Sequence, residues 1–199
     1  YPGGAVLNIY DALYKYSDKI THIITAHEQG ASHAADGYSR ATGKVGVCIA
    51  TSGPGATNLV TGIATAMLDS IPMVAITAQV GTGMIGTSAF QETDVFGMTA
   101  PIVKHSCLIT KLEDIPRVIK EAFYIANTGR RGPVLIDLPI DVQLETIRHF
   151  EYPETVNLRT YKPTVMGHAV QIKKVITQLE RAKRPIICVG GGVHLSHAS

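Results

Sequence analysis

The sequence predicts an α/β fold: a doubly wound parallel sheet followed by the first αβ unit of a second α/β domain. Two observations support this prediction. Short apolar runs, rich in β-branched residues and bounded by Gly, Pro or polar turns, alternate with longer segments of helical period. This alternation is typical of a parallel sheet with helices on both faces. The chain has 199 residues, of which 45% are hydrophobic and 17% charged, so a well-buried core is expected.

The elements of the sheet follow from the periodicity of each segment. Strands are predicted at short apolar runs rich in β-branched residues: residues 20–25, 45–50, 73–78, 102–109 and 134–138. Helices are predicted at residues 5–16, 28–42, 54–70 and 113–128. Gly43 is a suitable residue to end the second helix, and Pro116 fits the first turn of the fourth, where its missing N–H costs nothing.

The pattern changes after Pro139, and this change predicts a domain boundary. Residues 1–145 form the first domain, and residues 146–165, which mix charges and prolines without periodicity, form a linker. Residues 166–199 then begin a second domain, with a helix at 169–179 and a strand at 185–189 that runs into Gly190, Gly191 and Gly192. Such a glycine run is a weak phosphate or dinucleotide signal and equally a plain turn.

Charge and cysteine content exclude several classes of function. The formal net charge is +2 without a basic cluster, so neither nucleic acid nor a membrane surface is an expected partner. The apolar runs are too short to span a bilayer. The three cysteines are scattered, as expected of reduced thiols in a cytoplasmic protein.

Glu28 is the first candidate catalytic residue, because it ends an apolar run and begins a predicted helix. Thr25 and Glu28 fit a capping box, so a purely structural role is one interpretation. The functional interpretation is that Glu28 lies at the end of a buried strand, where parallel sheets bind ligands, and carries a proton there.

The turn Gly53-Pro54-Gly55 is the second candidate, because it connects a strand to a helix. It is either a tight turn or a place where a ligand ring lies against bare backbone. No Gly-Lys-Ser/Thr follows, so it is not a P-loop, and it is not a GxGxxG dinucleotide turn. His27 and His33 are six residues apart, not the four of a zinc helix, so no metal ligand is predicted in this chain.

Together these motifs resemble those of thiamine-diphosphate enzymes, and specifically of acetolactate synthases (acetohydroxyacid synthases). The resemblance covers essentially the whole chain and is carried by segments in the family's order and spacing: residues 1–5, 27–31, 34–38, 51–59, 66–72, 90–92 and 132–137. It implies decarboxylation of pyruvate on thiamine diphosphate and transfer of the two-carbon unit to pyruvate or 2-oxobutyrate, in branched-chain amino-acid biosynthesis.

The resemblance also implies roles for individual residues. Glu28 matches the glutamate that hydrogen-bonds N1′ of the aminopyrimidine, and Phe90 and Gln91 match residues that line the keto-acid pocket. The remaining matches are to cofactor-binding positions: Tyr1, Gly3, Gly4, Pro54, Asn58 and Gln91 beside the thiamine, and Arg130, Gly190, Gly191 and Gly192 at FAD.

In the family, the diphosphate and Mg²⁺ are bound by a C-terminal domain with a Gly-Asp-Gly motif, which is absent here. The resemblance therefore implies a fragment that is inactive alone. It also implies a homodimer or homotetramer, with a regulatory small subunit as a possible partner. The chain departs from the family pattern at Gly81, where Pro is usual, at Ile140, where Lys is usual, and at Arg131, where Pro is usual. In the family the positions of Gly81 and Ile140 lie at the active-site entrance, which Gly81 is expected to loosen.

These departures leave two alternatives open. Ile140 removes a positive charge expected at the active-site entrance, which keeps another thiamine-diphosphate enzyme possible, of the pyruvate oxidase or sulfoacetaldehyde acetyltransferase type. A non-catalytic binding or assembly protein of the same fold is the second alternative. Glu28 argues against it, because a scaffold needs no buried acid.

Overall fold

The computed structural model describes all residues except 1, 197 and 199. The chain divides into two compact units, Tyr1–Asn157 and Leu158–Ser199. The division falls within the predicted linker. The domain boundaries proposed from the sequence, 1–145 and 166–199, remain a prediction.

The first unit is built on a parallel sheet, as predicted. Its strands are β1 (Gly46–Ala50), β2 (Met73–Gln79), β3 (His105–Leu108) and β4 (Pro133–Pro139). They lie in the order β1-β2-β4-β3, and each described pairing is parallel. The two central strands are almost wholly buried, because helices cover both of their faces.

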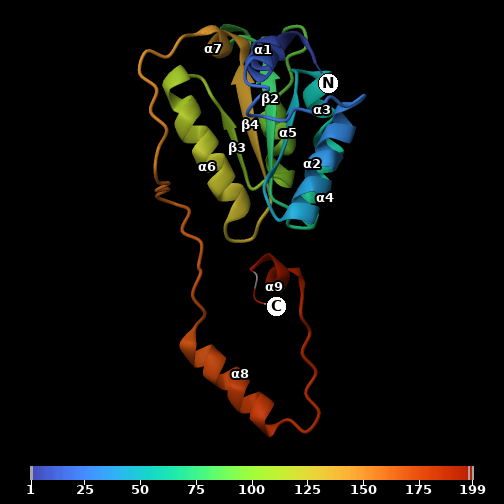
Figure 1. The fold of residues 1–199 in the computed structure, drawn as a ribbon, viewed down its shortest axis with the longest axis vertical. Coiled ribbons are helices and arrows are strands. Elements are labelled where there is room, and N and C mark those ends of the chain that lie inside the picture. Colours follow the sequence, from blue (N-terminus) through green and yellow to red (C-terminus); the bar gives the residue numbers. More distant parts are fainter. Residues whose placement is uncertain (1, 197, 199) are drawn as a thin grey trace. The chain divides into compact units, whose positions relative to one another are not determined.

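Helices flank this sheet on two sides (Figure 1). Helix α6 packs against β4, β2 and β3, while α2 packs against β1 and against α4. The helical elements of the first unit are η1 (Gly4–Val6), α1 (Leu7–Lys15), α2 (Glu28–Thr42), α3 (Pro54–Thr57), α4 (Val60–Leu68), η2 (Thr82–Met84), α5 (Val95–Thr99), η3 (Ala100–Ile102), η4 (Leu112–Asp114), α6 (Ile115–Asn127) and α7 (Ile140–Leu144).

Helix α2 has the predicted bounds but a different N-terminal cap. His27 is the N-cap residue, and its Nδ1 accepts a hydrogen bond from the Gln29 amide at 3.1 Å. Thr25 donates its hydroxyl to the carbonyl of His27, so the predicted capping box of Thr25 and Glu28 does not form. The carboxylate of Glu28 is therefore not used as a cap. At the other end, Gly43 adopts a left-handed conformation with φ 70°, as expected of a C-terminal glycine.

The strand predicted at residues 20–25 is wrong. The segment has no regular structure, and Ile20, Ile23 and Ile24 are 51%, 79% and 64% exposed. A strand needs a neighbouring backbone for its hydrogen bonds, and no described strand pairs with this segment.

Two other predictions are right in kind but differ in their bounds. The helix predicted at 54–70 is two helices, α3 and α4, and the strand predicted at 102–109 shortens to β3. Pro101 lies in the first turn of η3, which occupies the start of that predicted strand.

The second unit contains the helices α8 (Ala169–Arg181) and α9 (Gly191–Leu195). Helix α8 confirms the helix predicted at 169–179. The strand predicted at 185–189 is wrong, because these residues form no ladder and Ile186 and Ile187 are 95% and 70% exposed. No helix among the described residues is long and apolar enough to cross a membrane.

Candidate functional site

The candidate site lies at the carboxyl edge of the sheet, where parallel sheets usually bind ligands. Strand β1 ends at Ala50, and the turn of residues 51–53 leads directly into α3. Glu28 is the first residue of α2, which packs against β1. Since α2 leads back to the amino end of β1, its own N-terminus lies at the carboxyl edge. The fold thus brings Glu28 and the glycine turn, 25 residues apart in the sequence, to one place.

Glu28 is buried and hydrogen-bonded. Only 6% of the residue is exposed, and its Oε2 accepts a hydrogen bond from the Asn58 side-chain amide at 3.0 Å. Asn58 follows the last residue of α3, so the first turn of one helix is joined to the end of another. The amide of Asn58 thus orients the carboxyl group of Glu28 through one of its oxygens. Glu28 and Asn58, both predicted site residues, are therefore brought together.

The other Glu28 oxygen lies over the glycine turn. A Cβ atom added to Gly55 would lie 3.4 Å from Oε1 and 2.7 Å from the Thr51 methyl carbon. Gly3 packs on the same threonine, because a Cβ there would lie 2.4 Å from that methyl carbon. The Thr51 hydroxyl is buried and has no hydrogen-bond partner among the described residues. An unpartnered buried hydroxyl beside a buried acid is suited to a polar ligand.

The predicted role of Gly53 is only partly supported. The residue has φ 61°, as a strained turn requires, but a Cβ there would lie 2.8 Å from the Gln91 carbonyl oxygen. The space left by the missing side chain is thus taken by the chain's own backbone and not by an open surface for a ligand ring. Gln91 itself has φ 58°. The structure therefore brings the predicted residue Gln91 to the glycine turn through its main chain.

Tyr10 is a site residue that the sequence did not indicate. Partial burial, and after it the charge of Glu28, raise the pKa of its phenol, so Tyr10 lies within electrostatic range of the candidate acid. Its ring also packs edge-on against His22, with centroids 5.0 Å apart. Tyr10 falls within an ordinary amphipathic helix, so periodicity could not distinguish it from a core residue.

The remaining predicted residues beside the thiamine are less closely packed. Pro54 and Phe90 adjoin Gly53 and Gln91 in the sequence and so lie at the same edge, but Pro54 is exposed and Phe90 is 87% exposed. Gly4 has no neighbouring atom within reach of a Cβ. Tyr1 lies outside the described residues.

Arg130 lies at the opposite edge of the sheet, in the connection that enters β4. Its guanidinium donates to the Ser70 hydroxyl at 2.9 Å and to the Met67 carbonyl. Gly190 and the two glycines after it open α9 in the second unit. The FAD-binding residues proposed from the resemblance therefore form no common site within the first unit.

Gly81 and Ile140, the two departures expected at the entrance, lie near one another. Asp141 follows Ile140 in α7, and its carboxylate accepts hydrogen bonds from the Thr82 amide at 2.9 Å and the Thr82 hydroxyl at 2.6 Å. Burial raises the pKa of Asp141, but these hydrogen bonds outweigh it, and the pKa is lowered overall. The looseness expected from Gly81 is thus opposed by an anchor one residue later.

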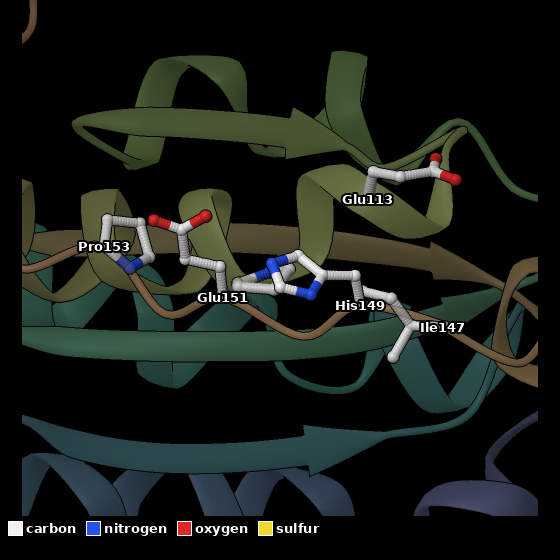
Figure 2. Close-up of a pocket in the computed structure, with 6 residues that line it drawn as sticks. Glu113, Ile147, His149, Glu151 and Pro153 are labelled. Atoms are coloured by element: carbon white, nitrogen blue, oxygen red, sulfur yellow. The ribbon is translucent and has the colours of Figure 1, made fainter.

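Two cavities among the described residues lie away from this edge. One, of about 300 Å³, is formed by the start of α6 and the segment after α7, and is lined by Glu113, Pro116, Ile147, His149, Glu151 and Pro153. Figure 2 shows the Glu113 carboxylate turned away from His149 and Glu151, so its ionisable groups do not converge. Among the described residues, no group of three or more His, Cys, Asp or Glu could hold a metal ion. Convergent polar groups, not cavity size, favour the Glu28 edge.

Comparison with known proteins shows which family the chain resembles. Residues 1–98 match the family described as thiamine pyrophosphate enzyme, N-terminal TPP binding domain. The chain is 56% identical over its whole length to the acetolactate synthase large subunit of Buchnera aphidicola subsp. Schizaphis graminum, of which it covers 35%. It is 60% identical to a probable acetolactate synthase large subunit of Methanococcus aeolicus, again over the whole chain and 33% of that relative.

A third relative is the acetolactate synthase isozyme 3 large subunit of Escherichia coli K12. The identity is 54% over 96% of this chain and 33% of that protein. The chain spans about a third of the length of the curated relatives it matches.

Proposed function

Because residues 1–98 of the chain belong to the thiamine pyrophosphate enzyme family, we propose that the chain is the pyrimidine-binding part of an acetolactate synthase large subunit. The intact protein would decarboxylate pyruvate and transfer the two-carbon unit to pyruvate or 2-oxobutyrate. The observation that carries the proposal is the buried Glu28 carboxyl at the carboxyl edge of the sheet, oriented by Asn58 at 3.0 Å.

The residues at this edge fit an aminopyrimidine. Glu28 would hold a proton at N1′ of the ring, and the unpartnered Thr51 hydroxyl would meet a polar group of the ligand. When bound, thiamine diphosphate supplies a carbon nucleophile for the keto group and an electron sink for decarboxylation. The chain's own contribution is to orient the ring and to move a proton at N1′ through Glu28.

FAD and Mg²⁺ are proposed on the resemblance alone. Arg130 would contact FAD, with Gly190, Gly191 and Gly192 supplying a further part of its site. These residues do not form a flavin pocket within either unit, so we assign no chemical step to FAD. Mg²⁺ would be held with the diphosphate by a part of the protein that the chain does not contain.

The partners and location follow from the same proposal. The relatives are named large subunits, so we propose that a regulatory small subunit is a partner. A homodimer or homotetramer of the large subunit is proposed on the resemblance alone. Cytoplasmic location is proposed from the scattered cysteines. The domains would be residues 1–145, a linker at 146–165 and the start of a second domain at 166–199, a division supported by the two compact units.

The test is acetolactate formation from pyruvate by the intact protein that contains this chain, with thiamine diphosphate, Mg²⁺ and FAD supplied. We expect acetolactate as the product. Consumption of pyruvate without formation of acetolactate would indicate an enzyme of the pyruvate oxidase or sulfoacetaldehyde acetyltransferase type. Ile140→Lys, which introduces the residue usual in acetolactate synthases, would then be the first variant to test. Absence of both cofactor binding and pyruvate consumption would favour a non-catalytic scaffold.

A further inference from the structure

A second buried carboxyl lies at the same edge of the sheet and has no part in the chemistry proposed above. Asp137, on β4, is 2% exposed. In the strand register it pairs with Thr77, which pairs in turn with Ala50, the last residue before the Thr51–Gly53 turn. Its oxygens accept hydrogen bonds from the Thr77 hydroxyl at 2.7 Å and from the Gln79 side-chain amide at 3.0 Å.

Gln79 uses this carboxylate to fix its own orientation. Its Nε2 also donates to the Thr93 carbonyl at 2.9 Å, and its Oε1 accepts from the Val80 amide at 2.9 Å. One buried side chain therefore holds both ends of the segment 80–93. An ionised carboxylate can only accept hydrogen bonds, so it requires the amide nitrogen, and not the oxygen, to face it. The same nitrogen then reaches Thr93.

Segment 80–93 contains residues in unfavourable backbone conformations, and one of them lies against the candidate site. Ser88 and Gln91 have φ 59° and 58°, which are uncommon for residues other than glycine. The Glu92 carboxylate supports them by accepting hydrogen bonds from the Gly86 and Ala89 amides. These amides lower the pKa of Glu92. With the segment in this conformation, the Gln91 backbone lies in close contact with Gly53.

We propose that Asp137 is a positioning residue: through Gln79 it holds segment 80–93 so that Gln91 and Phe90 stay beside the glycine turn, where the keto acid binds. This inference rests on the proposed function for the identity of the substrate. The clamp itself, from Asp137 through Gln79 to Thr93, rests on the hydrogen bonds alone.

The clamp should respond to pH. Burial raises the pKa of Asp137 to about 6, against the hydrogen bonds from Thr77 and Gln79, and the charge of Asp94 raises it further. Asp94 is the N-cap of α5, where its carboxylate accepts from the Gly97 amide. Protonation of Asp137 adds a hydrogen to a carboxyl group that already faces two donors, so the bond to Gln79 weakens.

The experiment compares Asp137→Asn and Gln79→Met with Thr77→Val in the intact protein. Gln79→Met removes the clamp, and Asp137→Asn weakens it by replacing one of the two acceptor oxygens with a donor. Thr77→Val removes the other hydrogen bond of Asp137 but leaves Gln79 in place, so it is a matched buried control. Two readouts are taken: amide hydrogen exchange of segment 80–93, and the KM for pyruvate.

We expect exchange in segment 80–93 to speed up roughly tenfold in Asp137→Asn and Gln79→Met, as for loss of a hydrogen bond to a charged group, and to stay unchanged in Thr77→Val. The KM should rise by a similar factor in the same two variants while kcat changes little. In the unsubstituted protein, exchange in the segment should speed up below about pH 6, beyond its intrinsic pH dependence, and this extra response should vanish in Asp137→Asn.

Equal effects of all three variants on exchange would reduce Asp137 to a fold-stabilising residue and overturn the proposal. Unchanged exchange in Asp137→Asn and Gln79→Met would overturn it as well. Failure of the unsubstituted protein to turn over pyruvate would refute the proposed function instead, and the exchange readout would still decide whether the clamp exists.

Discussion

At the scale of single residues, Glu28 is the group on which the proposed chemistry depends. Its Oε2 is held by Asn58, and its Oε1 faces Gly55. Glu28→Gln preserves the shape of the side chain but cannot carry a proton. We expect exchange of the C2 hydrogen of thiamine diphosphate, bound to the intact protein and followed by NMR, to slow by roughly 10² or more, as for loss of general acid–base assistance.

Glu113→Gln is the matched control for this substitution. Glu113 is an exposed carboxylate on the wall of the 300 Å³ cavity, and within the described part of the chain no hydrogen bond joins it to the candidate site. In the Glu113→Gln variant, the C2 hydrogen of bound thiamine diphosphate should exchange at the same rate as in the unsubstituted protein. Exchange at the normal rate in Glu28→Gln, with cofactor bound, would refute the role of Glu28.

At the scale of elements, the interior and the C-terminal end of helix α2 respond oppositely to the same kind of substitution. Gly43 has φ 70° after the last turn of α2, so Gly43→Ala should destabilise the chain by about 1–2 kcal/mol, the cost of the left-handed conformation. Gly37 lies inside the helix with open space where a Cβ would be, so Gly37→Ala should stabilise it by about 0.5–1 kcal/mol. Urea unfolding of the two variants measures both values. Changes of the same sign would contradict the left-handed cap.

The hydrophobic pattern of the sequence predicted two kinds of element correctly: helices with clear end signals, and strands at the centre of the sheet. The bounds of α2 follow from its start and its terminal glycine, and β2 and β4 are continuous apolar runs because both of their faces are covered. Residues 20–25 and 185–189 carry the same strand pattern and still form no strand. Pattern reports the preference of a segment, whereas a ladder also needs a neighbouring backbone.

The candidate site was predictable to a similar extent. Glu28, Asn58 and Gln91 were expected from motifs and are brought to one edge. Tyr10 and Asp137 were not assigned to the site. Nothing in an amphipathic helix distinguishes Tyr10, and Asp137 is the one charged residue of an apolar run whose partners the sequence does not give. Their roles depend on the register between strands and on the packing of α1, which a single sequence does not reveal.

At the scale of the whole molecule, the buried Asp137 should make stability fall as the pH rises. Its pKa in the folded chain is about 6, raised mainly by burial from an ordinary value of 3.8. The folded state therefore binds more protons than the unfolded state between these values. The stability present below the ordinary pKa is lost as the pH passes through the folded pKa, and the loss from this group is about 3 kcal/mol.

Comparison with Asp137→Asn isolates this contribution, because every other titrating group is common to both chains. The free energy of unfolding in urea would be measured for each chain at about pH 4 and about pH 7.5, below and above the window in which Asp137 ionises. The unsubstituted chain should lose about 3 kcal/mol more than the variant between the two values. An equal loss in both chains would mean that Asp137 ionises as easily in the folded state as in the unfolded one. The network with Thr77 and Gln79 would then fully offset the cost of burying the charge, and the clamp on segment 80–93 would keep its strength in weak acid.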